Sequence, residues 1–347
     1  MSLHRTVENT KTLAKVATIT IAGIILLIFV LRILIGVKDL LFPKQAPPPV
    51  EGFGKLPPIL FPKSALTTKL VYPIDTVTGT LPTFPDRIEV YKTIQPQPSL
   101  LFLNRARDKV SKLGFSSGGK QIAPTVYQWE NPNPPYKKIV LDILSFNFEM
   151  TSDFLSDKNV LDSRNVPGGN GAIDLSKSFL SGISSFPSDI DDSKTKMTQL
   201  SIKDNKLTPA TSFSTTQIIQ VDFYQKNIKD YQVYYPNYPG SSMSILVGGG
   251  QFQGGQVVGA HFFHQQIGEE STTYPLKSSQ EAYQELQEGK AFIVSFNGSG
   301  KAAYINNMHL GYYISETKQD YLMPIYIFEG RNSFYAFLSA IRNESLK

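Results

Sequence analysis

The stretch SILVGGGQFQGGQVVGAHFF, residues 244–263, decides how the chain is interpreted, because it places five glycines within eight residues between two apolar runs. A phosphate-binding loop needs such glycines to open a helix whose amides point at the anion, with Lys and Ser or Thr following. Here the residues after the glycines, QVVGAHFF, have the β-branched and aromatic composition of a strand. The stretch therefore predicts a twisted hairpin with a flexible tip and no nucleotide site.

Short strand-like runs flank this hairpin on both sides, and each group of runs contains one amphipathic segment. Ser99–Gly114 has apolar residues at helical spacing before a glycine, and Ser278–Gly289 opens with a Ser-x-x-Glu capping box. We therefore predict an α+β fold with a two-lobed antiparallel-sheet ectodomain and a packed helix in each lobe. The predicted boundaries are 69–153 for the first lobe, 154–212 for a polar connecting region and 213–347 for the second lobe.

The amino-terminal part of the chain has the pattern of a membrane anchor. Residues 16–37 are apolar except for two threonines and Arg32, and as a helix they would extend about 33 Å, one bilayer core. A cleaved signal peptide is the alternative, but no small-x-small cleavage site follows the run. We predict a cytoplasmic tail over 1–15, a single transmembrane helix over 16–37 and a semi-rigid Pro-rich linker over 38–68.

The charge distribution predicts the orientation and excludes one class of partner. Arg5, Lys11 and Lys15 precede the apolar run, which favours a cytoplasmic amino terminus and an extracytoplasmic carboxy-terminal domain in the plasma membrane. Beyond residue 44 the chain has 28 Lys or Arg against 27 Asp or Glu. Nucleic-acid binding is therefore not expected, because that part lacks the excess of positive charge that phosphate backbones require.

The common catalytic and metal-binding patterns are absent from the sequence. There is no cysteine, which excludes disulfides, thiolate zinc sites and cysteine nucleophiles. His261 and His264 would point to opposite faces of a strand, which makes them poor co-ligands. The acidic segment 189–200 lacks the glycine and glutamate of a calcium loop and is interpreted as a solvated loop. We predict no enzyme activity, no cofactor and no metal, although paired carboxylates from distant strands stay open, since they leave no local pattern.

Aromatic residues supply the only candidate binding surface. An exposed platform of such rings could bind a carbohydrate or a protein, whereas strand aromatics more often belong to the core. The candidate partner-binding residues are Trp129, Tyr234, Tyr235, Tyr238, Tyr312 and Tyr313.

The carboxy-terminal third contains a further pattern. YPLKSSQEAYQELQEGKA followed by INNMHLGYYISETKQDYLMPIYIFEG, within Tyr274–Gly330, resembles the end of the YycH/YycI-type membrane-anchored regulators of Gram-positive bacteria and, more distantly, PepSY-like modules. The resemblance implies one transmembrane helix, an extracytoplasmic α+β part and regulation of a sensor kinase. The Pro-rich linker and the interval 154–212 depart from that pattern.

These observations lead to one main hypothesis and two alternatives. The main hypothesis is a bitopic membrane protein of the bacterial cell envelope whose extracytoplasmic domain is a non-catalytic, regulatory protein-binding module. The alternatives are a cell-wall or polysaccharide binding or processing protein, which predicts an aromatic-lined cleft with carboxylates, and a structural stalk of an envelope assembly.

Overall fold

A computed structural model describes residues 50–64, 70–116, 118–133, 136–163, 165–184, 186–250 and 256–347, together with residues 23, 26–29 and 32. The chain divides into two units, 1–48 and 49–347. In the first unit Gly23, Leu26–Phe29 and Arg32 are helical; the rest of the predicted tail and anchor lies outside the described residues. No helix among the residues described here is long and apolar enough to cross a membrane.

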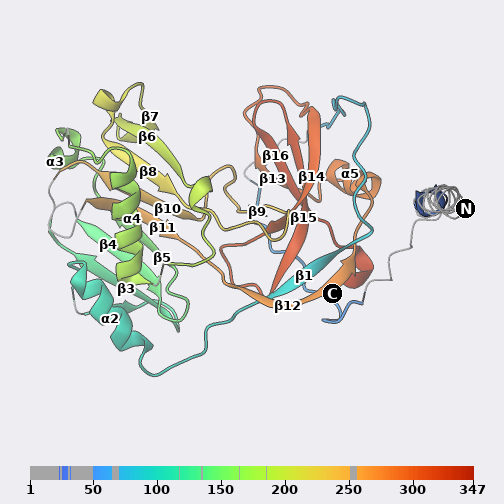
Figure 1. Ribbon diagram of the computed structural model, residues 1–347. Coiled ribbons are helices and arrows are strands. Elements are labelled where there is room, and N and C mark those ends of the chain that lie inside the picture. The colour runs from blue at the N-terminus through green and yellow to red at the C-terminus, as the bar shows by residue number, and fades with distance from the viewer. Residues whose placement is uncertain are drawn as a thin grey trace, which may run out of the picture. The chain divides into compact units, whose positions relative to one another are not determined.

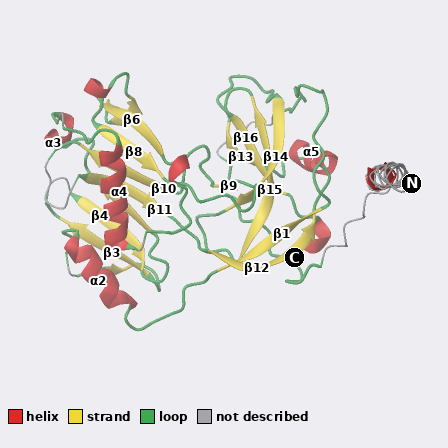
Figure 2. Ribbon diagram, in the orientation of Figure 1, coloured by secondary structure: helices red, strands yellow, loops and turns green. Residues whose placement is uncertain are grey.

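The second unit is a mixed α+β structure, mostly β, with two sheets (Figures 1 and 2). In the described part of the chain one sheet has nine strands, all paired antiparallel, and we call it the nine-stranded sheet. Its strands, in spatial order, are β2 (Lys120–Gln121), β3 (Val126–Asn131), β4 (Lys137–Asp142), β5 (Phe148–Ser152), β11 (Val257–Phe262), β10 (Met243–Gly248), β8 (Ile218–Asp222), β6 (Lys196–Lys203) and β7 (Lys206–Pro209).

Helices cover one face of this sheet (Figure 1). Alternate residues of the central strands, such as Met150, Phe262 and Ile245, are buried beneath α4 and α2, as the period of two along a strand requires. The rings of Phe148 and Phe179 meet edge to face at 6.1 Å. The helices on this part of the chain are α2 (Phe102–Lys112), α3 (Lys158–Leu161) and α4 (Asn170–Ile183), with 3₁₀ turns η1 (Asp192–Lys194) and η2 (Phe213–Thr215).

The other sheet, which we call the seven-stranded sheet after its strands within the described ranges, is built around the long strand β15 (Tyr321–Gly330). The path β12 (Ile267–Pro275), β1 (Arg87–Thr93), β15, β14 (Ile305–Tyr313), β9 (Val233–Tyr234) is antiparallel except for β14 with β9. Strand β16 (Phe334–Ser339) also pairs with β15, and β13 (Phe292–Ser295) pairs with β16. Helix α5 (Ser279–Gln287) and 3₁₀ turn η3 (Asn343–Ser345) complete this part.

The predicted boundaries at residues 153 and 213 do not separate these two sheets. Strand β1 pairs with β12 and β15, whereas β8, β10 and β11 extend the sheet begun by β2–β5. The interval 154–212 is more than a connection, because it supplies α4, which packs on the nine-stranded sheet, and the paired strands β6 and β7. The prediction failed because strand partners are chosen across long sequence separations, which local patterns do not report.

Two local predictions are confirmed. Strands β10 and β11 form the antiparallel hairpin predicted for residues 244–263, with residues 251–255 outside the described part. In α5 the Ser278 hydroxyl accepts a hydrogen bond from the Glu281 amide, and the Glu281 carboxylate accepts one from the Ser278 amide. Gly289 follows with φ of +79°, the left-handed conformation that ends a helix.

Much of the predicted linker is part of the folded unit. We call residues 50–64 the strap, because they lie along the seven-stranded sheet near the carboxy terminus (Figure 1). Leu56 is fully buried; its amide donates to Ser345 O at 2.9 Å, and the Lys347 amide donates to Leu56 O at 2.8 Å. The prediction of a semi-rigid linker over 38–68 is therefore wrong for the strap. The prolines give it an extended backbone, and its apolar side chains then pack against the sheet.

Candidate functional site

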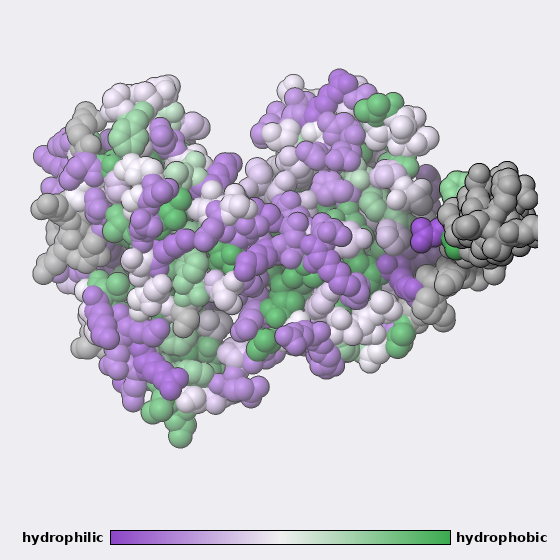
Figure 3. All heavy atoms as spheres, viewed as in Figure 1, coloured by the Kyte–Doolittle hydropathy of each residue, from purple (hydrophilic) through white to green (hydrophobic). Residues whose placement is uncertain are grey.

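A pocket of about 470 Å³ lies between the two sheets, and segments of both line its wall. The nine-stranded sheet contributes Val140 and Glu149, the connection from β11 to β12 contributes 263–266, and the seven-stranded sheet contributes 94–96 after β1 and 315–318 after β14. In the space-filling view, hydrophilic residues cover much of the middle of the molecule (Figure 3). The volume lies within the range of small-ligand sites.

A row of polar residues crosses the helix-free face of the nine-stranded sheet and reaches this pocket. Glu149 is the cross-strand partner of His261, His261 of Ser244, and Ser244 of Asp222. Directly opposed residues on neighbouring strands have side chains about 5 Å apart on one face. Because their sequence neighbours face α2 and α4, these four point the other way. Burial raises the pKa of Asp222, while hydrogen bonds from Gln220 and Ser244 oppose that shift.

Glu316 joins the two sheets at the edge of the pocket. It follows β14 in the seven-stranded sheet, and its Oε1 lies 2.7 Å from His261 Nε2 on β11 of the other sheet. The Ser242 hydroxyl donates to the same oxygen at 2.9 Å. Burial acts to raise the pKa of Glu316, but the hydrogen bond and charge of His261, with the Ser242 hydrogen bond, hold it below its usual value. The carboxylate is therefore the favoured form.

A second histidine–carboxylate pair lies close by in the sequence. His264 Nε2 is 2.8 Å from Asp189 Oδ1, and Gln225 Nε2 donates to Asp189 Oδ2 at 2.8 Å. Burial acts to raise the pKa of Asp189, yet the hydrogen bonds from His264 and Gln225 lower it overall. The prediction of a solvated loop over 189–200 is wrong for Asp189, because its carboxylate is tied to His264. It is also wrong for residues 196–200, which belong to strand β6.

The two histidines therefore have separate carboxylate partners. Among the residues that the structure describes, no group of three or more His, Asp and Glu could hold a metal ion. A Ser–His–carboxylate triad needs the hydroxyl to donate to the imidazole and the imidazole to the carboxylate. Here the Ser242 hydroxyl donates to Glu316 instead. These contacts orient His261 and hold Glu316 in place. They leave Ser242 without a base that would activate it as a nucleophile.

The predicted aromatic platform does not exist as an exposed surface. Trp129, Tyr234, Tyr235, Tyr312 and Tyr313 are all at most 3% exposed, and only Tyr238 is half-buried. The Tyr234, Tyr238 and Phe337 rings pack together on the seven-stranded sheet, and the Tyr312 hydroxyl donates to Glu89 O at 2.7 Å. The alternative interpretation, core packing, holds for these positions. None of the six lines the pocket.

Sequence reasoning missed the residues that do reach the site. Glu316 lies in a loop with no motif, and Glu149 is one polar position in an alternating strand; neither carries a local signal. His261 and His264 were considered only as metal ligands. The alternation of polar and apolar residues along β5 could have indicated a polar sheet face, but not which loop would cover it.

No protein-family model and no curated protein matches the chain. Among solved structures, it is similar to an uncharacterized protein from Eubacterium rectale, with 10% sequence identity, a TM-score of 0.42 and coverage of 74% of this chain and 84% of that one. The resemblance to YycH/YycI-type regulators stays a prediction.

Proposed function

We propose that this chain is a single-pass membrane protein of the bacterial cell envelope whose folded part is a non-catalytic recognition and regulatory module. In this proposal the two sheets act as two lobes, and the pocket between them receives part of a protein partner. The observation that supports it is that both sheets line one pocket. At the pocket, Glu316 of one sheet contacts His261 of the other. A partner bound in the pocket would therefore contact or displace residues of both sheets at once.

The membrane placement in this proposal rests on the apolar segment 16–37 and the basic residues before it. Since the strap is packed on the sheet, only residues 38–49 are left to act as a spacer, and support for a long structural stalk is correspondingly reduced. Protease added to intact cells should remove the folded part and leave the tail protected. Protection of the folded part from added protease would contradict the orientation.

The partner is tested by site-specific crosslinking in intact membranes. A photoreactive amino acid replaces Gln266, an exposed residue of the pocket wall, and the matched control position is Lys206, exposed on edge strand β7. We expect a crosslinked envelope protein from position 266 and not from position 206. Equal products at both positions, or none at 266, would argue against recognition at the pocket.

One observation favours the polysaccharide alternative. The pocket wall combines the half-buried ring of Phe263 with the carboxylates of Asp142 and Glu149, and the alternative predicted an aromatic-lined cleft with carboxylates. Calorimetric titration of the purified full chain with soluble cell-wall fragments tests it. Saturable binding that Phe263→Ala abolishes would favour this function over protein recognition, and absence of binding would remove it.

A further inference from the structure

We propose that the group bound in the pocket between the sheets is an organic cation, an alkylammonium ion carried by a small amine or by a lysine side chain. This inference rests on the proposed recognition function and names the chemistry of its ligand. It depends on three features of the described residues: an acceptor without a donor, a carboxylate without a partner, and an excess of negative charge.

The acceptor is the side-chain oxygen of Gln265, a residue of the pocket wall. The Gln265 amide nitrogen donates to Gln319 O at 2.6 Å, and because a carbonyl can only accept, this contact fixes which side-chain atom is the oxygen. That Oε1 is buried and has no hydrogen-bond partner among the described residues. A buried acceptor without a partner costs free energy, and a ligand N–H would recover it once the Gln265 side chain turns its oxygen toward the pocket.

The carboxylate is that of Glu149. Glu316 is engaged by His261 and Ser242, and Asp142 accepts hydrogen bonds from the Leu144 and Ser145 amides within its own turn. Glu149 is exposed on β5, and its carboxylate makes no hydrogen bond or ion pair within the part of the chain that the structure describes. It is therefore the acid in the wall that can bind a ligand without breaking a contact inside the protein.

The charges of the wall have a net negative sign. Asp142, Glu149 and Glu316 give three carboxylates, and Lys318 is the one Lys or Arg among the described lining residues. His264 also lines the pocket, with its Nε2 held by Asp189. A polar wall of this sign attracts cations and repels carboxylate and phosphate ligands.

Size and apolar surface define the rest of the ligand. The volume of about 470 Å³ accommodates a small molecule or one extended side chain with its backbone. Val126, Val140 and Phe263 provide apolar wall beside the acids, which suits the methylene stem of an alkylammonium ion.

The test uses three probes with the same five-carbon body: cadaverine, 1,5-pentanediol and glutarate. Equilibrium dialysis is performed on the full chain in zwitterionic nanodiscs, with empty nanodiscs as the blank. We expect saturable binding of cadaverine that weakens as salt is added, and no binding of the diol or the dianion. Equal binding of the diol, or tighter binding of glutarate, would overturn the proposal.

A parallel titration with an acetylated Ala-Lys-Ala amide distinguishes the two sources of the cation. Tighter binding of this peptide than of cadaverine assigns a peptide side chain, and weaker binding assigns a free amine.

Charge variants locate the site. Glu149→Gln should weaken cadaverine binding about tenfold, the effect of one charge-assisted hydrogen bond. Lys318→Gln should tighten it about threefold by removing a like charge. Both residues are exposed, so the fold should tolerate each change. The control is Asp174→Asn, the same loss of one charge on α4, which covers the opposite face of the sheet. Equal effects of Glu149→Gln and Asp174→Asn would mean nonspecific attraction and would refute the site.

The two proposals fail in different ways. If cadaverine and the lysine peptide do not bind but position 266 still crosslinks to a protein, the recognition function stands and the ligand chemistry is wrong. If cadaverine binds but no protein is captured at position 266, the cation site stands and the protein-binding function does not.

Discussion

Glu316 Oε1 lies 2.7 Å from His261 Nε2, and this contact joins the loop after β14 in the seven-stranded sheet to β11 in the nine-stranded sheet. Both side chains are 32% exposed, so solvent screens the pair in part. The pair matters because it links the two sheets at the pocket. Segments of the chain that belong to one sheet are followed by segments that belong to the other.

The pair predicts a specific pH dependence of stability. Because the pKa of Glu316 in the folded state lies below its usual value of about 4.5, its contribution is fully present above the unfolded pKa and is lost as pH falls through the folded pKa. Glu316→Gln should lower the free energy of unfolding at neutral pH by about 1–3 kcal/mol. The free energy of unfolding of this variant should also decrease less steeply as the pH is lowered. Urea unfolding of the full chain in detergent, followed by fluorescence of its one tryptophan, measures both. An unchanged acid response would show that Glu316 does not make this contribution.

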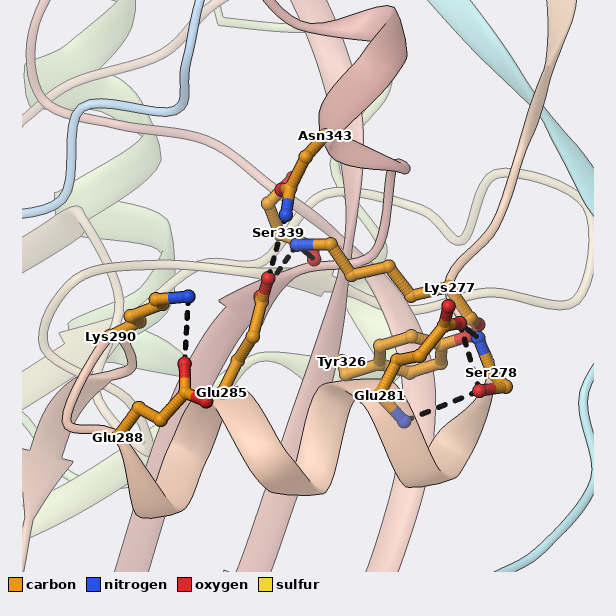
Figure 4. Close-up of polar contacts among 9 residues, drawn as sticks. All are labelled: Lys277, Ser278, Glu281, Glu285, Glu288, Lys290, Tyr326, Ser339 and Asn343. Carbon is orange, nitrogen blue, oxygen red and sulfur yellow. Dashed lines mark hydrogen bonds and ion pairs between the residues drawn. The ribbon is translucent and has the colours of Figure 1, made fainter.

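The buried ion pair between Lys277 and Glu285 of α5 should be far more sensitive than the Glu316 pair to the loss of one partner. Lys277 Nζ lies 2.7 Å from Glu285 Oε2 with side chains 6% and 12% exposed (Figure 4). Asn343 donates to the other carboxylate oxygen at 2.9 Å. Lys277→Met leaves a buried carboxylate without its cation and should cost about 3–5 kcal/mol. The double variant Lys277→Met with Glu285→Leu should lose less than Lys277→Met alone, as chemical denaturation of both variants would show. A double variant less stable than the single one would contradict this account.

The position of the Trp129 indole is predicted to require glycine at position 119. A Cβ at position 119 would lie 2.5 Å from the indole Nε1 and Cε2 atoms, whereas a Cβ at Gly118 would meet nothing within 4 Å. Trp129 is 1% exposed, so the indole has no free space to move into. Gly119→Ala should destabilise the fold by about 1–3 kcal/mol and shift the tryptophan emission to longer wavelength. Gly118→Ala is the matched control and should leave both unchanged; equal effects of the two substitutions would remove the packing explanation.

The strap is predicted to stabilise the fold through Leu56. Leu56→Ala should cost about 2–5 kcal/mol, because the side chain is fully buried in the hydrophobic core. The same substitution at Leu60, which is 65% exposed, should have little effect. Limited proteolysis should cut within residues 50–64 of the Leu56→Ala protein under conditions in which the Leu60→Ala protein resists. Equal resistance of both variants would mean that the strap is not held by Leu56.

Turn and cap chemistry was predictable from the sequence because it acts between residues a few positions apart. Ser278 with Glu281 identified the start of α5, Gly289 its end, and the glycines of 244–263 a hairpin between two strands. The mixed α+β class also followed, since aromatic and β-branched alternation is a local property.

The tertiary structure alone decided which sheet each strand joins and which polar groups meet. Strand β1 pairs with β12, and their side chains Lys92 and Glu270 form an ion pair across 178 residues. Glu316 meets His261 across 55. Sequence periodicity states which side of a strand is apolar, but not whether the other side faces water or a second layer. Tyr312 and Tyr313 were predicted to be candidates for an exposed platform, yet they are buried, and the polar row that contains Glu149 and His261 borders a pocket. In both cases the environment of the side chain depends on segments that are brought together only when the chain folds.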